Sequence, residues 1–171
     1  MTRPVDVRIT HLEMTSPDAL RPAIHAPDGV KLARVPDDEA ASRARECYAL
    51  VGAPWHWSDR QHFDDAAWQA MLDEEHGEVW LARDADGVAG YFQLANHGEV
   101  VELRYFGLAP RCIGRGIGSW MLTRATERAW SLGPTRVVLN TCSLDGPAAL
   151  PNYLKRGFTV VREEHRTREI S

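Results

Sequence analysis

Three glycines, Gly114, Gly116 and Gly118, alternate with other residues between two segments of regular pattern. The apolar, strand-like segment 100–108 precedes them, and from Ile117 onwards apolar residues recur four apart, as on one face of a helix. A glycine-rich turn between a strand and a helix leaves backbone N–H groups bare, and the helix start adds a partial positive charge. The spacing therefore predicts a site for a phosphate or pyrophosphate group, and with it a phosphorylated cofactor.

The glycine spacing separates this site from two common kinds of nucleotide site. The chain has GxGxG and not the GxGxxG of dinucleotide folds, and the acidic residue that those folds place about 20 positions later is missing. The P-loop pattern GxxxxGK[ST] is missing as well. Taken alone, the three glycines could also form no more than a tight connection between a strand and a helix.

Two further motifs support the cofactor site. The segment Phe106-Gly107-Leu108-Ala109-Pro110 leads into the glycine turn, and the segment 146–158 ends in the pattern Tyr153-x-x-x-Gly-Phe. With these motifs in this order, the chain resembles the GNAT family of acyl-CoA-dependent N-acetyltransferases over residues 78–164. It departs from the family pattern at Ile113, where Gln or Arg is usual, and at Gly146, where Asn is usual. Pro151 is predicted to kink the helix that carries Tyr153.

The resemblance implies that acetyl-CoA is the co-substrate. Backbone N–H groups of the glycine turn would hold its pyrophosphate, and the strand just before the turn would pair with its pantetheine arm by strand addition. A backbone N–H near Leu108 would face the thioester oxygen as an oxyanion-type donor. The residues implied to bind acetyl-CoA are Phe106, Gly107, Leu108, Ile113, Gly114, Arg115, Gly116, Gly118 and Ser119.

The resemblance also implies direct transfer of an acetyl group from acetyl-CoA to a primary amine. Tyr153 is the candidate general acid, because a phenol of pKa about 10 can protonate a leaving thiolate; the other interpretation is a packed helix aromatic. Glu102 is the candidate general base. It lies six residues before Leu108 and is expected to share a strand face with Arg104, Phe106 and Leu108. Its other interpretation is a carboxylate that is paired with Arg104 or exposed to solvent.

The acceptor is less defined by the sequence. Trp55 and Trp57 follow the first helical segment and could clamp a flat or apolar acceptor, or pack in the core or in a dimer interface. We expect the acceptor to be a small-molecule amine, and a protein or peptide amine stays open as an alternative. A homodimer is also an open alternative for the oligomeric state. A non-catalytic acyl-CoA-binding or sensing module is the second class of function.

The composition is typical of a globular protein, with 44% hydrophobic and 26% charged residues. The net charge of −4 disfavours a nucleic-acid surface and mildly favours a cationic acceptor. Three cysteines without a CxxC pair, and histidines without ligand spacing, predict reduced thiols and no metal site. Neither a signal-peptide pattern nor a membrane-length apolar run occurs, so a cytoplasmic location is expected.

The periodicities predict strands and helices in the order ββ, αα, βββ, α, β, α, β. We expect one α/β domain over 1–171, with a single mixed, mostly antiparallel twisted sheet and helices on both faces, as in the GNAT fold. Within it, 1–28 would be a strand and a Pro-containing loop, 29–75 the acceptor-side strand and helices, and 78–168 the acetyl-CoA-binding core. Asp37 or Asp38 is predicted to cap the first helix, Asp145 or Gly146 is predicted to cap the last helix, and 162–168 is predicted to be a solvated strand or tail.

Overall fold

The computed structural model describes residues 1–171, which form seven strands and four α-helices in the predicted order. The strands are β1 (Arg3–Met14), β2 (Lys31–Arg34), β3 (Glu78–Asp84), β4 (Gly87–Asn96), β5 (Val100–Leu108), β6 (Arg136–Cys142) and β7 (Thr159–Ile170). The α-helices are α1 (Asp37–Gly52), α2 (Asp65–Glu75), α3 (Ile117–Ser131) and α4 (Ala149–Arg156). Three short 3₁₀ helices complete the structure: η1 (Pro17–Ala19), η2 (Ala53–Trp55) and η3 (Pro110–Cys112).

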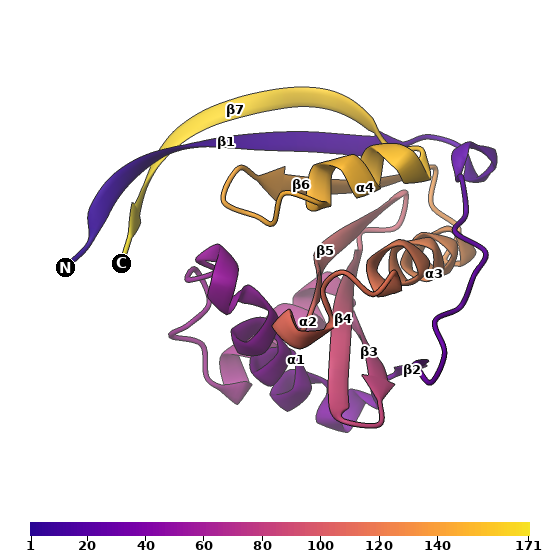
Figure 1. The fold of residues 1–171 in the computed structure, drawn as a ribbon, viewed down its shortest axis with the longest axis horizontal. Coiled ribbons are helices and arrows are strands. Elements are labelled where there is room, and N and C mark those ends of the chain that lie inside the picture. Colours follow the sequence, from indigo (N-terminus) through magenta and orange to yellow (C-terminus); the bar gives the residue numbers. More distant parts are fainter.

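All seven strands belong to one sheet, in the order β2-β3-β4-β5-β6-β1-β7. Every neighbouring pair is antiparallel except β5 and β6, which are parallel. The prediction of a single mixed, mostly antiparallel sheet is therefore confirmed. The first strand lies between β6 and β7, far from β2 (Figure 1), so strands that follow one another in the sequence do not pair here.

The helices cover both faces of the sheet, as predicted (Figure 1). One core, which includes Ile117, Met121 and Leu122, packs α3 and α4 against one face. A second core, which includes Val51 and Trp68, packs α1 and α2 against the other. No helix of the structure has both the length and the apolar character needed to cross a membrane.

Two predictions about helix starts are wrong. Asp37 and Asp38 lie inside the first turn of α1 and do not cap it; Pro36 holds the cap position without a side-chain hydrogen bond. The helix dipole favours acidic side chains in that turn. Helix α4 begins at Ala149, so Pro151 is its third residue. A proline in the first turn removes an N–H that has no partner within the helix, and the expected interior kink is therefore not required.

Strands β5 and β6 stay together only at their first residues. They pair over Val100–Glu102 and Arg136–Val138, and no later residue of β5 pairs with β6. From Leu103 to Leu108, β5 is bonded on its β4 side alone. A parallel sheet that opens in this way leaves backbone N–H and C=O groups available along one strand edge.

A β-bulge at Arg104 changes which side chains share a face of β5. Leu94 pairs with Leu103 but Gln93 pairs with Tyr105, so Arg104 is the extra residue. Arg104 and Tyr105 therefore both reach the α1–α2 side, where they contact Glu75 and Tyr48. The prediction that Glu102 shares a face with Phe106 and Leu108 is wrong, because the bulge reverses the alternation after Arg104.

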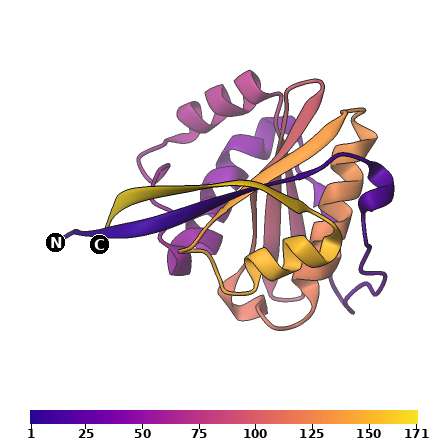
Figure 2. The same cartoon turned by 90° about the horizontal axis from the view of Figure 1, so that it is seen from above.

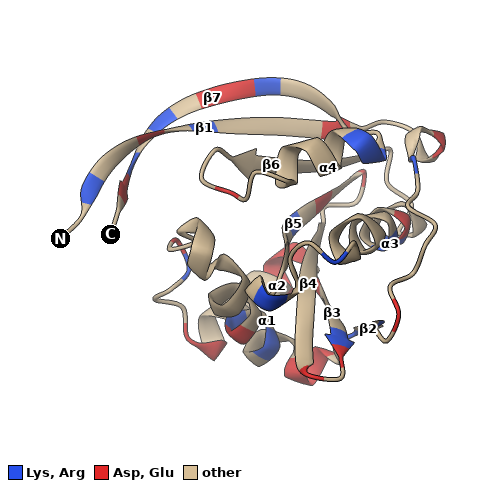
Figure 3. Cartoon of the chain, viewed as in Figure 1, with Lys and Arg blue, Asp and Glu red and all other residues tan.

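Strands β1 and β7 continue past β6 as a two-stranded ribbon (Figures 1 and 2). Within β1, Ile9–Glu13 pairs with both β6 and β7, whereas Arg3–Arg8 pairs with β7 alone. The predicted solvated segment 162–168 is a strand, and charges of both signs follow one another along it (Figure 3). Arg168 forms an ion pair of 2.7 Å with Asp59, which ties the ribbon to the connection between α1 and α2.

Candidate active site

The glycine turn ahead of α3 has the backbone geometry of an anion site. Gly114 and Gly116 have φ angles of +87° and +77°, a left-handed conformation that glycine adopts without a steric penalty. Helix α3 then starts at Ile117 without a side-chain cap. None of the backbone N–H groups from Gly114 to Ser119 donates a hydrogen bond within the protein. Unpaired donors at a helix start, reinforced by the helix dipole, form a phosphate-binding arrangement.

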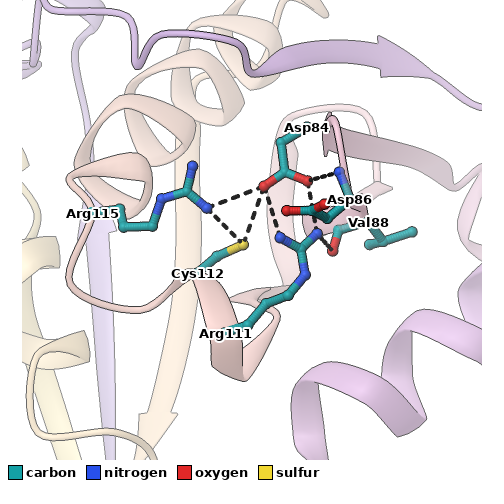
Figure 4. Close-up of polar contacts among 6 residues, drawn as sticks. All are labelled: Asp84, Asp86, Val88, Arg111, Cys112 and Arg115. Carbon is teal, nitrogen blue, oxygen red and sulfur yellow. Dashed lines mark hydrogen bonds and ion pairs between the residues drawn. The ribbon is translucent and has the colours of Figure 1, made fainter.

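A carboxylate at the end of β3, that of Asp84, anchors this loop (Figure 4). Both Nη atoms of Arg111 donate to Asp84 at 2.8 Å, and Nη1 of Arg115 donates to it at 3.1 Å. Arg111 also donates to the carbonyl of Val88. Hydrogen bonds from Arg111 and Arg115 outweigh burial and hold the pKa of Asp84 well below its usual range. Because its guanidinium is paired with Asp84, Arg115 offers the site mainly its backbone N–H.

A cavity of about 350 Å³ opens where β5 and β6 separate. Of the predicted site residues, those that line it are Phe106, Gly107, Leu108, Ile113, Gly118 and Tyr153. Gly114, Arg115, Gly116 and Ser119 lie in the adjoining loop and at the start of α3, outside the lining, and Glu102 is also outside it. The size is that of a small-molecule site.

Gly107 allows α1 to approach the backbone of β5. A Cβ at this position would lie 2.3 Å from Cγ1 of Val51 in α1, so any larger residue would displace the helix. The same added Cβ would lie 3.8 Å from the ring of Trp57. The predicted cofactor-side residue Gly107 therefore also fixes the position of the opposite wall of the cavity.

Tyr153 lies on α4 with its ring against Phe106 and Phe158, at centroid distances of 6.1 and 6.3 Å. Its side chain lines the cavity, although the residue is 93% buried. Burial raises the pKa of Tyr153 well above its ordinary value, and the negative charge of Asp145 raises it further. The phenol therefore remains protonated at neutral pH, as a proton donor must be.

Glu102 is the last residue of β5 that pairs with β6, at the point where the strands separate. Burial raises the pKa of its carboxyl, which the charge of Arg104 partly offsets. Arg104 forms its ion pair with Glu75 at 3.3 Å and none with Glu102, so the predicted alternative of a Glu102–Arg104 pair is not found.

Asp145 is a cavity residue that the sequence interpretation treated only as a helix cap. Its Oδ1 accepts a hydrogen bond from the indole of Trp57 at 3.2 Å. Its Oδ2 accepts from the hydroxyl of Thr141 at 2.7 Å and from the backbone N–H of Cys142 at 2.9 Å. Its position directly after a strand that ends beside the cavity was the only sequence signal for this role.

Asn152 was also missed. It lines the cavity and accepts a hydrogen bond of 3.2 Å from the hydroxyl of Ser119, which joins α4 to the start of α3. Trp55 and Trp57 both line the cavity, and Trp57 also packs on Tyr48 and Tyr105. Trp57 therefore both lines the cavity and takes part in internal packing.

Comparisons with known proteins agree with this geometry. The family model described as "Acetyltransferase (GNAT) family" matches residues 42–158. A GCN5-related N-acetyltransferase from Sphaerobacter thermophilus superposes with a TM-score of 0.75 at 19% identity, over 98% of this chain and 53% of that one. A GCN5-related N-acetyltransferase from Kribbella flavida gives a TM-score of 0.64 at 21% identity, over 92% and 56%.

A tandem GNAT protein from the clavulanic acid biosynthesis pathway gives a TM-score of 0.65 at 14% identity, over 98% of this chain and 55% of that one. The chain thus spans about half the length of these solved proteins. A comparison with curated proteins finds no match. The family match covers more than half of the chain, and the fold and the glycine loop agree with it, so this chain belongs to the GNAT family of acetyltransferases.

Proposed function

We propose that this chain transfers an acetyl group from acetyl-CoA to the primary amine of a small molecule, by direct attack of the amine on the thioester. The observation that carries the proposal is the continuity of three features. The unpaired N–H groups of Gly114–Ser119 adjoin the open edge of β5, and that edge leads along the cavity to the hydroxyl-bearing ring of Tyr153.

The residues present fit acetyl-CoA. Six unpaired N–H groups at the start of α3 suit a pyrophosphate, and the unpaired edge of β5 suits a chain of amides such as pantetheine. Ile113 and Gly118 line the cavity between these two parts. When bound, acetyl-CoA supplies an activated acetyl group whose leaving group is a thiolate.

The chain's own residues then have three tasks. A backbone N–H near Leu108 donates to the carbonyl oxygen as negative charge develops there. Glu102 accepts a proton from the amine; because it lies outside the cavity lining, that proton reaches it through an intervening group. Tyr153 gives its proton to the sulfur as the C–S bond breaks and the C–N bond forms, and it is reprotonated from solvent.

Tyr153→Phe tests this assignment. Free thiol release is measured with acetyl-CoA and a panel of amines, and acetyl-CoA affinity by calorimetry. We expect kcat to fall about 100-fold, in the range of general acid catalysis, with the Kd for acetyl-CoA within about twofold of wild type. The matched control is Tyr91→Phe, because Tyr91 is fully buried, makes no hydrogen bond through its hydroxyl and does not line the cavity.

An unaltered rate in Tyr153→Phe would remove Tyr153 as the acid. If the wild-type protein binds acetyl-CoA but releases no thiol with any amine, the chain is instead a non-catalytic acyl-CoA-binding module, the second class of function that the sequence left open.

A further inference from the structure

The cavity wall opposite the proposed acetyl-CoA residues is aromatic. It is built by Tyr48, Trp55, Trp57 and Tyr105. The rings of Tyr48, Trp57 and Tyr105 contact one another with centroid distances of 5.3 to 5.8 Å. The ring of Trp55 lies against Gly146, where a Cβ would come within 3.1 Å of it. Such a wall favours a flat, apolar body in the acceptor.

Five charged residues line the same cavity, and three of them are neutralised by partners. Arg168 pairs with Asp59 at 2.7 Å, and both line the cavity. Arg104 pairs with Glu75 at 3.3 Å. The two charges that remain without an ion pair are Asp145 and Arg60.

Asp145 carries an uncompensated negative charge near the reacting end of the cavity. All three of its hydrogen-bond donors, the indole of Trp57, the hydroxyl of Thr141 and the N–H of Cys142, are neutral. They fix the carboxylate without cancelling its charge, and one lone-pair direction of Oδ1 stays free. Asp145 lines the same cavity as Tyr153, the proposed acid. A positive ammonium group is the natural complement of such a carboxylate.

Arg60 carries the uncompensated positive charge. Its Nε donates to the hydroxyl of Tyr105 at 3.4 Å, and its guanidinium lies over the ring of Phe63 at 5.0 Å. Its backbone N–H donates to the hydroxyl of Tyr48 at 3.2 Å, which fixes the chain at this point. Neither Nη atom donates to a protein group. A guanidinium held in this way presents a planar pair of donors to a carboxylate or phosphate.

The contacts place aromatic rings between these two charges. Asp145 bonds to Trp57, Trp57 packs on Tyr105, and Tyr105 bonds to Arg60. We propose that the acceptor is a small amine that also carries an anionic group, the two joined by a flat apolar segment. Asp145 takes the ammonium group and Arg60 takes the anion. This inference rests on the proposed function and narrows the acceptor, which the net charge of −4 alone would make simply cationic.

Two probe amines of the same shape test it: 4-(aminomethyl)benzoate, which has the anion, and 4-methylbenzylamine, which has a methyl group in its place. We expect wild-type kcat/KM to favour the benzoate at least tenfold. Arg60→Gln should reduce that preference to below about threefold while changing kcat/KM for 4-methylbenzylamine by less than threefold. Asp145→Asn should raise KM for both probes by similar factors of at least tenfold.

Arg43→Gln serves as the matched control, because Arg43 lies on α1 outside the cavity and pairs with Glu46. It should keep the wild-type preference. A wild-type preference for 4-methylbenzylamine would overturn the inference. The inference would also be overturned if Arg60→Gln lowered kcat/KM by the same factor for both probes, because Arg60 would then have a structural role only.

Binding separates this inference from the proposed function. Ligand-observed NMR of each probe with the protein and CoA requires no acetyl transfer. If acetyl-CoA releases no CoA thiol in the presence of either probe, acetyl transfer to these amines fails, yet binding of 4-(aminomethyl)benzoate that disappears in Arg60→Gln would still support the acceptor site. Equal binding of both probes to wild type and Arg60→Gln would refute it.

Discussion

At the scale of single residues, burial acts on two groups of the site in the same direction but with different chemical results. It raises the pKa of Tyr153, which keeps the phenol protonated and ready to donate. It also raises the pKa of Glu102, which makes the ionised carboxylate a stronger base. Low-polarity surroundings that disfavour the charged forms therefore suit both proposed roles, Tyr153 as the acid and Glu102 as the base.

The pKa of Glu102 leads to a prediction for the pH dependence of the reaction. A base must be ionised, so kcat should fall as the pH decreases through a value above 4.5, the ordinary pKa of the group. Glu102→Gln should lower kcat about 100-fold and abolish that limb of the profile, with the acceptor KM within about threefold. The profile is measured at saturating acceptor, so that it reports the ternary complex.

Glu99→Gln is the control for this experiment, because Glu99 lies just before β5 in an exposed turn. It should keep the wild-type profile. If the acid limb of the kcat–pH profile is unchanged in Glu102→Gln, a group other than Glu102 accepts the proton of the amine.

At the scale of secondary-structure elements, a buried carboxylate joins β3 to α3. Glu78 accepts two hydrogen bonds of 2.9 Å from Arg128 and one of 2.9 Å from the indole of Trp80. Its side chain is 7% exposed. Burial raises the pKa of Glu78, but the hydrogen bonds from Arg128 and Trp80, together with the charges of Arg34 and Arg128, lower it by more, so the net pKa lies below 4.5. The ionised form is therefore the one that stabilises the fold.

Glu78→Gln should lower the free energy of unfolding by about 2 kcal/mol at pH 7, because Arg128 and Trp80 lose their charged acceptor. A depressed pKa gives stability that is present above the unfolded-state pKa and is lost as the pH falls through the folded-state value. The difference from wild type should therefore shrink below pH 4.5. Urea denaturation at a series of pH values measures it.

The control is Glu46→Gln, which breaks an exposed pair between Arg43 and Glu46 within one helix. It should change the free energy of unfolding by less than about 0.5 kcal/mol. If both variants lost the same free energy of unfolding, the buried contacts of Glu78 with Arg128 and Trp80 would stabilise the fold no more than an exposed ion pair does.

The elements that the sequence predicted well are those set by local pattern. Strand β5 has the predicted bounds, because apolar residues and flanking turns mark it. The bulge at Arg104 and the position of β1 between β6 and β7 were not predictable, because both depend on pairing between distant segments. The site divides in the same way. The glycine turn is local, whereas the proposed roles of Asp145 and Arg60 depend on the fold that brings them to one cavity.

At the scale of the whole molecule, the proposed site lies where two parts of the sheet separate. Strands β2–β5 and strands β6, β1 and β7 are joined by only three pairs of residues. The glycine turn follows β5 from the first part, while β6 of the second part leads towards α4, which carries Tyr153. Arg168 of β7 also lines the cavity, and in Figure 1 the β1–β7 ribbon lies above the rest of the chain. A ligand bound here would contact both parts of the sheet.

This arrangement depends on the bare N–H groups ahead of α3, and calorimetric titration with acetyl-CoA tests them directly. The variants are Gly116→Leu and, as the matched control, Gly98→Leu. Both glycines have left-handed φ angles, +77° and +84°, with no atom within 4 Å of an added Cβ, but Gly98 lies in a turn far from the site. Circular dichroism and thermal unfolding confirm that both variants are folded.

Gly98→Leu should bind acetyl-CoA with a Kd within about twofold of wild type. Gly116→Leu should weaken binding at least about 100-fold, because two or more charge-assisted hydrogen bonds to phosphate are lost. Equal affinities of Gly116→Leu and Gly98→Leu for acetyl-CoA would contradict the account.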